Sequence, residues 1–473
     1  MVEPALPPLS RRVFCNRTLN LRALPAVGCD MDYTLVHYDT LRWERRAYEV
    51  ACQLLLRRKW PVERLRFDPE LVSLGLIVDN DLGNLVKANR FGHVRNACHG
   101  TRMLGFEEWR SIYTAAPVDP SDSRWSFMST LFSLSEACLY IQLVDLLDQG
   151  KLEPGLSYRT LHGRIRQVMD AAHLEGELKS EIMADPTRYV VLDADLAPTL
   201  LDLKHAGKKL LLITNSEWNY THRMMSYALD RYLGGGSWRQ LFDIIVVQAR
   251  KPAFFSEKAP AFRLADERGL YEPHLGPLKP GDVYLGGHAR LVESSLGLSA
   301  DDILYIGDHI FADVHVSKDL LRWRTALVVR ELERELDEVE AFRESQELLD
   351  EGMRRKEILE YEYSQLRLAL QRSREGQKNL SAAREEDVKR RLRQLRESLV
   401  ELDARLAPLA KASGELLNRR WGLLMRSGND KSHLAQNIER YADIYMSRVS
   451  NLLAYTPFVY LRASRGSLPH DPL

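Results

Sequence analysis

The chain has 473 residues, more than one ordinary compact core holds, so we expect two or three lobes with a well-buried interior. Lys plus Arg and Asp plus Glu each number 66, so there is no global basic field of the kind that gathers nucleic acid or anionic membrane, and we expect neither as a partner. The five cysteines are scattered, odd in number and without C-x-x-C spacing, which argues against a disulfide framework or a zinc site and favours a reducing compartment.

The N-terminal stretch MVEPALPPLSRRVF lacks the hydrophobic segment of a signal peptide, and no apolar run approaches the roughly 20 residues of a membrane span. Its arginines leave a transit peptide open as an alternative, but a strand-like apolar segment begins by Leu24 and leaves little to cleave. We therefore expect a cytoplasmic protein.

Four short apolar runs each lead into a polar tip. The runs are AVGCD ending at Asp30, KLLLITNS ending at Ser216, FDIIVVQARK ending at Lys251, and DILYIGD ending at Asp308. Continuous apolar runs of this length, separated by helical patterns, are typical of buried parallel strands, so the predicted fold class is α/β. Ligands bind beyond the carboxyl ends of such strands, and we expect the four tips to converge on one site.

The stretch between the first and second predicted strands, residues 31 to 208, far exceeds the length of one crossover helix. It must contain an inserted domain, which would cover the strand ends as a cap. We predict a catalytic core formed by residues 12–48 and 190–330, and a cap domain over residues 49–189 that sets substrate specificity.

Beyond about Arg330 the sequence becomes dense in Glu, Arg and Leu, and we assign residues 331–419 to a helical extension. An apolar seam there steps by four, three, four, three and four residues, which predicts a helical hairpin or coiled coil ending near Pro408. Packing within the chain is favoured, and packing between chains, which would make a homo-oligomer, stays open. Residues 420–473 are too apolar and aromatic for a disordered end, so we expect them to pack back on the core. The seam consists of Val388, Leu392, Leu395, Leu399, Leu402 and Leu406.

The strongest chemical signal is Asp30 and Asp32, directly after the first predicted strand. Two carboxylates two residues apart at a strand end can point into one crevice, one as nucleophile and the other as acid and base. A lone D-x-D is weak evidence and fits a solvated turn or a helix cap equally well. Here D-x-D-x-T becomes strong evidence, because three further elements follow it in order.

The second and third elements suit a phosphate group. Thr214, Asn215 and Ser216 offer hydroxyl, amide and backbone N–H groups to phosphoryl oxygens without adding charge, and the Lys251 ammonium can neutralise phosphate and the attacking carboxylate together. Each of these residues alone would be an ordinary loop or surface residue, so the prediction depends on the ordered set.

The fourth element is the pair Asp308 and Asp313, five residues apart after a strand. Hard oxygen ligands at this place suit Mg²⁺, which takes one or two carboxylates and leaves its other positions to water and substrate phosphate. The complete set is what in-line phosphoryl transfer requires.

This ordered set resembles the haloacid dehalogenase superfamily of phosphatases, which implies a Rossmann-like parallel sheet core. Longer phrases, from about Arg12 to Tyr460, look like the cytosolic purine 5′-nucleotidases that prefer IMP and GMP. The resemblance implies Mg²⁺-dependent hydrolysis of purine nucleoside 5′-monophosphates and leaves nucleoside phosphotransfer open. The phrases are RVFCNRTLNL, DMDYTLVHY, ITNSEWNYT, ARKPAFF, LYIGDHIFADV with SKDLLRWRT, RWGLLMRSG and RYADIY.

The resemblance also implies a role for each matching residue. Asp30 is the nucleophile that becomes phosphorylated, and Asp32 protonates the leaving ribose 5′ oxygen and then activates water. Mg²⁺ is held by Asp30, the backbone carbonyl of Asp32 and Asp308, whereas Asp313 orients the metal's waters or Lys251.

The cap carries a second match. Arg166, Asp170 and His173 are spaced i, i+4, i+7, so a helix over IRQVMDAAH would place them on one face, and Lys179 follows beyond it. By the resemblance, residues at this spacing bind the base, with Phe132 of STLFSLSE stacked on the ring. The alternative is an exposed helix with an ordinary i, i+4 ion pair.

Leu174 stands where the family tends to have an aromatic residue, which affects base preference rather than the reaction. His309 and Phe311 are interpreted as shaping their turn, with a nucleotide effector site at Phe311 as the alternative. The competing functions are a phosphatase for another phosphomonoester and a non-catalytic interaction protein, against which the intact catalytic set speaks.

Overall fold

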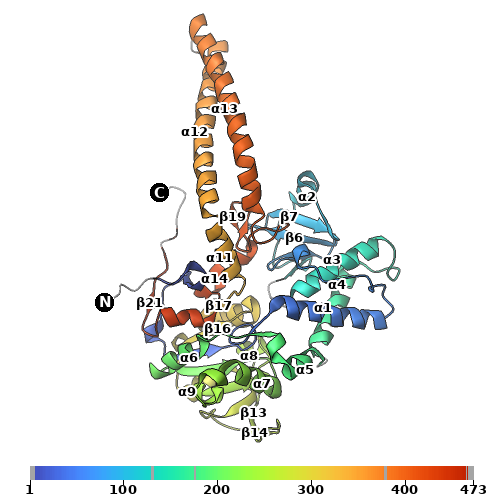
Figure 1. Cartoon of the computed structure of the whole chain (residues 1–473), viewed down its shortest axis with the longest axis vertical. Coiled ribbons are helices and arrows are strands. Elements are labelled where there is room, and N and C mark those ends of the chain that lie inside the picture. The colour runs from blue at the N-terminus through green and yellow to red at the C-terminus, as the bar shows by residue number, and fades with distance from the viewer. Residues whose placement is uncertain (1–5, 129–132, 175–176, 378–380, 465, 467–473) are drawn as a thin grey trace. The chain divides into compact units, whose positions relative to one another are not determined.

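The computed structural model describes residues 6–128, 133–174, 177–377, 381–464 and 466. The chain divides into two compact units, one formed by Met1–Glu333 with Leu424–Leu473 and the other by Arg334–Leu423. Figure 1 colours the chain from its N-terminus to its C-terminus.

A ten-stranded sheet forms the centre of the first unit. Its middle strands are parallel, and antiparallel pairs close both edges. The α/β class with a parallel sheet, predicted from the sequence, is thereby confirmed. The strands lie in the order β1 (Val13–Cys15), β20 (Ile444–Met446), β17 (Arg324–Val328), β16 (Ile303–Gly307), β3 (Ala26–Cys29), β11 (Lys209–Ile213), β12 (Ile244–Val247), β15 (Val283–Gly286), β13 (Ala261–Leu264) and β14 (Tyr271–His274).

The four predicted apolar runs became four adjacent parallel strands, β16, β3, β11 and β12. Apart from the exposed Lys209 at the start of β11, they are buried, because both faces of the sheet are covered. In β11, Leu211 and Ile213 belong to one buried cluster, whereas Leu210 and Leu212, which point to the opposite face, are equally buried. Parallel pairing brings the carboxyl ends of these strands to one edge.

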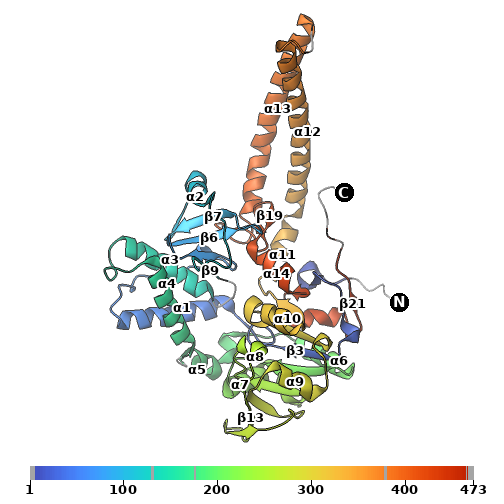
Figure 2. The same cartoon turned by 180° about the vertical axis from the view of Figure 1, so that it is seen from behind.

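Helices lie on both sides of this sheet (Figures 1 and 2). The short helices α8, α9 and α10 contribute side chains to the cluster on one face, and α6 packs on β11. The helices of the core are α6 (Leu196–His205), α7 (Trp218–Leu229), α8 (Ala253–Ser256), α9 (Ala289–Leu296), α10 (Val316–Leu321) and α14 (His433–Tyr441).

The stretch between β3 and β11 folds into an antiparallel sheet with helices packed beside it (Figure 1). Its strands lie in the order β8 (Arg102–Met103), β7 (Val94–His99), β6 (Asn84–Ala88), β5 (Ile77–Asp79) and β9 (Trp125–Phe127). The helices are α1 (Thr40–Arg57), α2 (Phe106–Tyr113), α3 (Ser133–Asp148), α4 (Tyr158–Leu174) and α5 (Glu177–Ala184), of which α4 packs on both α1 and α3. The boundary proposed between residues 48 and 49 falls inside α1.

The C-terminal segment takes part in the main sheet. Strand β20 pairs in parallel with β17 and antiparallel with β1, so residues from both ends of the chain complete this edge. Asp443, directly before β20, is held by the side chains of Lys318 and Arg324 at 2.5 and 2.9 Å. Two further short pairs, β2 (Leu19–Asn20) with β21 (Tyr460–Leu461) and β18 (Arg426–Ser427) with β19 (Asp430–Lys431), also involve this segment.

The second unit is a helical hairpin of α12 (Arg343–Arg374) and α13 (Ala382–Gly414), preceded by α11 (Leu332–Ala341). Leu395, Leu402 and Leu406 of the predicted seam are buried in it. The prediction that the seam helix ends near Pro408 was wrong, because α13 continues to Gly414 with Pro408 inside it. A proline in a helix removes one backbone donor, and the exposed position of this ring leaves room for it. Among the described residues, no helix is both long and apolar enough to span a bilayer.

Candidate active site

Asp30 begins a tight turn directly after β3. Its own N–H donates to the carbonyl of Ile306 on β16 at 2.9 Å, and the Met31 carbonyl then accepts the N–H groups of Leu35 and Val36, both at 2.9 Å. Tyr33 inside the turn has a φ of 54°, a conformation that side chains other than glycine rarely adopt. The turn folds the chain back so that Asp30 and Asp32 both stay at the strand end.

Asp30 lies in a buried ion cluster with Lys251 and Asp313. The Lys251 Nζ is 2.8 Å from Asp30 Oδ2 and 2.7 Å from Asp313 Oδ1. Burial raises the pKa of Asp30, and the charge of Lys251 opposes this. Burial also disfavours the charged lysine, but Asp30 and Asp313 together hold the pKa of Lys251 well above its usual value. The lysine therefore remains a cation facing two carboxylates.

The backbone at Lys251 is fixed by Asn215. The Asn215 side chain donates from Nδ2 to the Lys251 carbonyl at 3.1 Å, and its Oδ1 accepts the Lys251 N–H at 2.6 Å. Arg250, just before the lysine, has a φ of 62°. The structure thus places Asn215, predicted as a phosphate ligand, as a link between the ends of β11 and β12.

Tyr305 of β16 lies beneath the ion cluster. Its hydroxyl accepts a hydrogen bond from Lys251 Nζ at 3.1 Å and donates to the Ile213 carbonyl at 2.9 Å. Gly28 on the neighbouring strand makes room for the ring, because a Cβ at that position would lie 3.0 Å from a Tyr305 ring carbon. A glycine in the middle of β3 is therefore explained by the close approach of this side chain.

Three carboxylates converge at the strand ends. Asp30, Asp308 and Asp313 each offer an oxygen, and these oxygens all lie within 4.8 Å of one another. Burial, followed by the charges of Asp313 and Asp30, raises the pKa of Asp308 well above its ordinary value. A divalent cation would relieve this repulsion, and all the offered atoms are hard oxygens, so the donor set fits Mg²⁺.

Asp313 is held in place by the turn that follows β16. Its Oδ2 accepts the N–H of His309 at 3.2 Å, and His309 Nδ1 accepts the N–H groups of Phe311 and Ala312, both at 3.2 Å. Burial, followed by the charge of Lys251, lowers the pKa of His309 to about 4, which agrees with an acceptor at Nδ1. His309 therefore shapes the turn, as the first of the two interpretations expected.

Asp32 is held at both carboxyl oxygens. Tyr38 donates to Oδ1 at 2.5 Å and Ser216 donates to Oδ2 at 2.6 Å. Burial raises the pKa of Asp32, opposed first by Lys179 and then by these hydrogen bonds. The Thr214 hydroxyl accepts the N–H of Ser216 at 3.1 Å. The hydroxyl of Ser216, which was predicted to bind substrate, instead donates to Asp32.

Two of the cap residues predicted to bind the base lie together on α4. Arg166 and Asp170 are both exposed on α4, and Arg166 Nε lies 4.0 Å from Glu136. The backbone of His173 belongs to α4, and its side chain, like the whole of Phe132, falls outside the described residues.

Lys179 lies closer to the chemistry. Its Nζ is 4.8 Å from the centre of the Tyr220 ring, and its charge acts on Asp32. Tyr38, Tyr220 and Tyr305 were not predicted from the sequence as site residues. Tyr38 stands inside the phrase DMDYTLVHY, and nothing in that phrase shows which of its side chains turn back toward Asp32.

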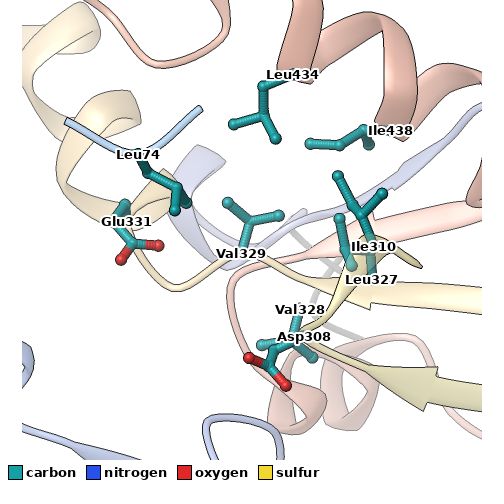
Figure 3. Close-up of a pocket in the computed structure, with 9 residues that line it drawn as sticks. All are labelled: Leu74, Asp308, Ile310, Leu327, Val328, Val329, Glu331, Leu434 and Ile438. Carbon is teal, nitrogen blue, oxygen red and sulfur yellow. The ribbon is translucent and has the colours of Figure 1, made fainter. Parts of the chain in front are cut away.

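A small cavity of about 20 Å³ adjoins Asp308 (Figure 3). The carboxyl groups of Asp308 and Glu331 share it with aliphatic side chains that include Leu74, Val329 and Leu434. Burial raises the pKa of Glu331 to about 7. A volume of this size holds about one water molecule, so Asp308 faces a small space on this side, lined mostly by aliphatic side chains.

The sequence matches one protein family over almost its whole length. The model described as the 5′ nucleotidase family covers residues 13–473. The chain belongs to the 5′-nucleotidase family. It is accordingly a phosphoric monoester hydrolase that acts on nucleotides, and the resemblance noted from the sequence is confirmed.

The similar proteins include a 5′-nucleotidase domain-containing protein of Dictyostelium discoideum, which is 28% identical over 485 residues, covering 99% of this 5′-nucleotidase-family chain and 76% of the relative. Among solved structures, a HAD phosphatase from Thermococcus onnurineus is 13% identical with a TM-score of 0.28, and an archaeal beta-phosphoglucomutase from Pyrococcus is 10% identical with a TM-score of 0.29. Each of these two comparisons covers 65% of this chain and 87% of the other.

Proposed function

We propose that the protein is a Mg²⁺-dependent, cytoplasmic purine 5′-nucleotidase that works through an aspartyl phosphate on Asp30. The observation that supports this most directly is the meeting of Asp30, Lys251, Asp308 and Asp313 at one edge of the sheet, with Asp32 held beside them. Asp30, the backbone carbonyl of Asp32 and Asp308 would hold the cation. When bound, Mg²⁺ neutralises charge on the phosphoryl group during transfer.

In the first step a carboxylate oxygen of Asp30 bonds to phosphorus while the bond from phosphorus to the ribose 5′ oxygen breaks. Asp32 gives its proton to that leaving oxygen, and Lys251 offsets the charge of Asp30 and the phosphate. In the second step Asp32 takes a proton from water as the water oxygen bonds to phosphorus, which frees Asp30 and releases phosphate. A nucleoside hydroxyl in place of water would give phosphotransfer.

A preference for oxopurines is supported by the shared exposed face of Arg166 and Asp170 on α4. A guanidinium and a carboxylate match the oxo group and the N–H of hypoxanthine and guanine. Lys179, which lies over the Tyr220 ring, adds a cation whose charge acts on Asp32.

The test is phosphate release from IMP, GMP, AMP, UMP, pyridoxal phosphate and an aryl phosphate, with Mg²⁺ and with EDTA. We expect IMP and GMP to lead, EDTA to abolish release, and Asp30→Asn to lower turnover by at least about 10³-fold because it removes the nucleophile. Added inosine tests for phosphotransfer, because a phosphoryl group passed to the inosine hydroxyl in place of water lowers the amount of free phosphate.

Asp81→Asn is the matched control, because it removes a carboxylate whose partner is Arg159 on the surface of the cap. Full activity of Asp30→Asn would overturn the assignment of the nucleophile. A lead for UMP or the aryl ester would keep the chemistry and overturn the purine preference, and a folded protein that releases no phosphate would favour an interaction role.

A further inference from the structure

The carboxyl group of Asp32 is held by a hydrogen bond at each of its two oxygens. Oδ1 accepts a hydrogen bond from the Tyr38 hydroxyl at 2.5 Å, and Oδ2 accepts one from Ser216 Oγ at 2.6 Å. A carboxyl group can rotate about its last side-chain bond, and two donors on opposite oxygens fix that angle. The lone pair that each oxygen keeps is then aimed in one direction.

Tyr38 is itself held firmly. The residue is 3% exposed, and its ring lies 4.6 Å from the ring of Trp43 and 5.2 Å from that of Tyr33, measured between centroids. Its short strand β4 (His37–Tyr38) pairs with β10 (Val190–Val191). Because the Tyr38 ring is packed against these two rings and its strand is paired, it cannot turn its hydroxyl away from Asp32 without a cost in packing.

The hydrogen bond from Tyr220 sets the direction in which the Tyr38 hydroxyl donates its proton. The Tyr220 hydroxyl, on α7, donates to the Tyr38 oxygen at 3.0 Å. Tyr38 therefore accepts from Tyr220 and gives its own proton to Asp32, so the row Tyr220, Tyr38, Asp32 runs in one direction. Lys179 lies over the Tyr220 ring at 4.8 Å and touches the far end of this row.

We propose that Tyr38, supported by Tyr220, is a positioning residue of the reaction, which orients Asp32 toward the leaving oxygen of the substrate. This inference rests on the proposed function. Asp32 gives its proton to the 5′ oxygen as the bond between that oxygen and phosphorus breaks, and recovers a proton from the water that cleaves the aspartyl phosphate. Tyr38 keeps its own proton throughout and acts only through the orientation of Asp32.

This role has a signature that general loss of structure does not share. An alkoxide leaving group, such as the ribose 5′ oxygen, needs a proton during departure, whereas p-nitrophenolate leaves readily without one. An incorrectly oriented Asp32 therefore slows phosphoenzyme formation from a nucleotide much more than from p-nitrophenyl phosphate.

The experiment measures phosphoenzyme formation in a single turnover by rapid quench, with IMP and with p-nitrophenyl phosphate, for the wild type and Tyr38→Phe of the full chain. We expect the rate with IMP to fall by about tenfold or more and the rate with the aryl ester by less than about threefold, as for the loss of one hydrogen bond to a carboxyl group that becomes charged as it gives up its proton. Tyr220→Phe, which leaves the contact with Asp32 in place, should raise the ratio of the aryl-ester rate to the IMP rate by about threefold.

Tyr48→Phe is the matched control, since Tyr48 is also buried and donates at 2.6 Å to the side chain of Gln142 in the cap. It should leave the ratio unchanged. An equal fall with both substrates in Tyr38→Phe, or no fall at all, would overturn the positioning role. If Tyr38→Phe does not fold, an unchanged ratio in Tyr220→Phe overturns it instead. Failure of the wild type to form a phosphoenzyme from either substrate would contradict the proposed function itself.

Discussion

At the scale of single residues, the site depends on charges kept away from water. Asp30, Asp313 and Lys251 are 9%, 1% and 7% exposed, so the strength of each ion pair is set by the protein interior and not by solvent. A buried group of this kind stays charged only when a partner stabilises it, as the two carboxylates do for Lys251. Glu44 is a buried carboxyl that behaves differently, because burial has the largest effect on its pKa.

Glu44 is fully buried in α1 and accepts the N–H of Ser135 at 2.7 Å. Burial raises the pKa of Glu44 from 4.5 to about 8, with the hydrogen bonds from Ser135 acting against it. The folded chain keeps the carboxyl protonated while the unfolded chain releases the proton above 4.5. Glu44 therefore contributes its full stability below that value, and the contribution is lost as the pH rises to about 8.

Glu44→Gln keeps an acceptor for Ser135 and removes the titration. Between about pH 6 and about pH 8, we expect the free energy of unfolding of the wild type to fall relative to that of this variant by up to about 2 kcal/mol. Urea unfolding followed by tryptophan fluorescence measures the difference, with Glu63→Gln at an exposed position as the control. A difference between the two proteins that is the same at both pH values would show that Glu44 is charged in the fold.

At the scale of elements, the strand ends and their turns place the catalytic groups. The turn after β16 must pass very close to Asp313, and only glycine permits this at position 307. A Cβ on Gly307 would lie 2.5 Å from the Cβ of Asp313 and 2.6 Å from its Cγ, so the aspartate would have to move. Since Asp313 pairs with Lys251, such a shift would also displace the lysine from Asp30.

Gly307→Ala is therefore expected to lower kcat by about tenfold or more and to destabilise the fold by about 1–3 kcal/mol through overpacking. Steady-state kinetics and thermal unfolding measure the two effects. Gly163→Ala is the control, because a Cβ at that position of α4 meets nothing within 4 Å. Equal activity of the two variants would show that the position of Asp313 does not matter for turnover.

At the scale of the whole molecule, the chain forms two units with separate cores. The hairpin of α12 and α13 has its own apolar cluster of Leu349, Leu402 and Leu406, and side chains such as Arg391 and Glu362 pair across it at 2.7 Å. None of the groups that we place in the reaction lies in Arg334–Leu423. Stability of the hairpin and turnover should therefore vary independently.

Leu402→Ala tests this independence. Leaving a cavity in the hairpin should destabilise it by about 2–4 kcal/mol and speed proteolytic cleavage within 334–423, while kcat stays within about twofold of the wild type. Val400→Ala, at a position that is 63% exposed, is the control for the same helix. A large loss of kcat in Leu402→Ala would show that the hairpin supports the catalytic unit.

Local patterns in the sequence were enough for the α/β class, the four strands that end at the catalytic groups, and the helical extension, because apolar runs and heptads directly encode which faces are buried. The tertiary structure decided the rest. Strand β20, from the C-terminal segment, enters the sheet between β1 and β17, Asn215 fixes the backbone of Lys251, and Tyr38 and Ser216 hold Asp32. Such contacts join residues far apart in the chain or depend on the direction of a turn, and packing alone determines them.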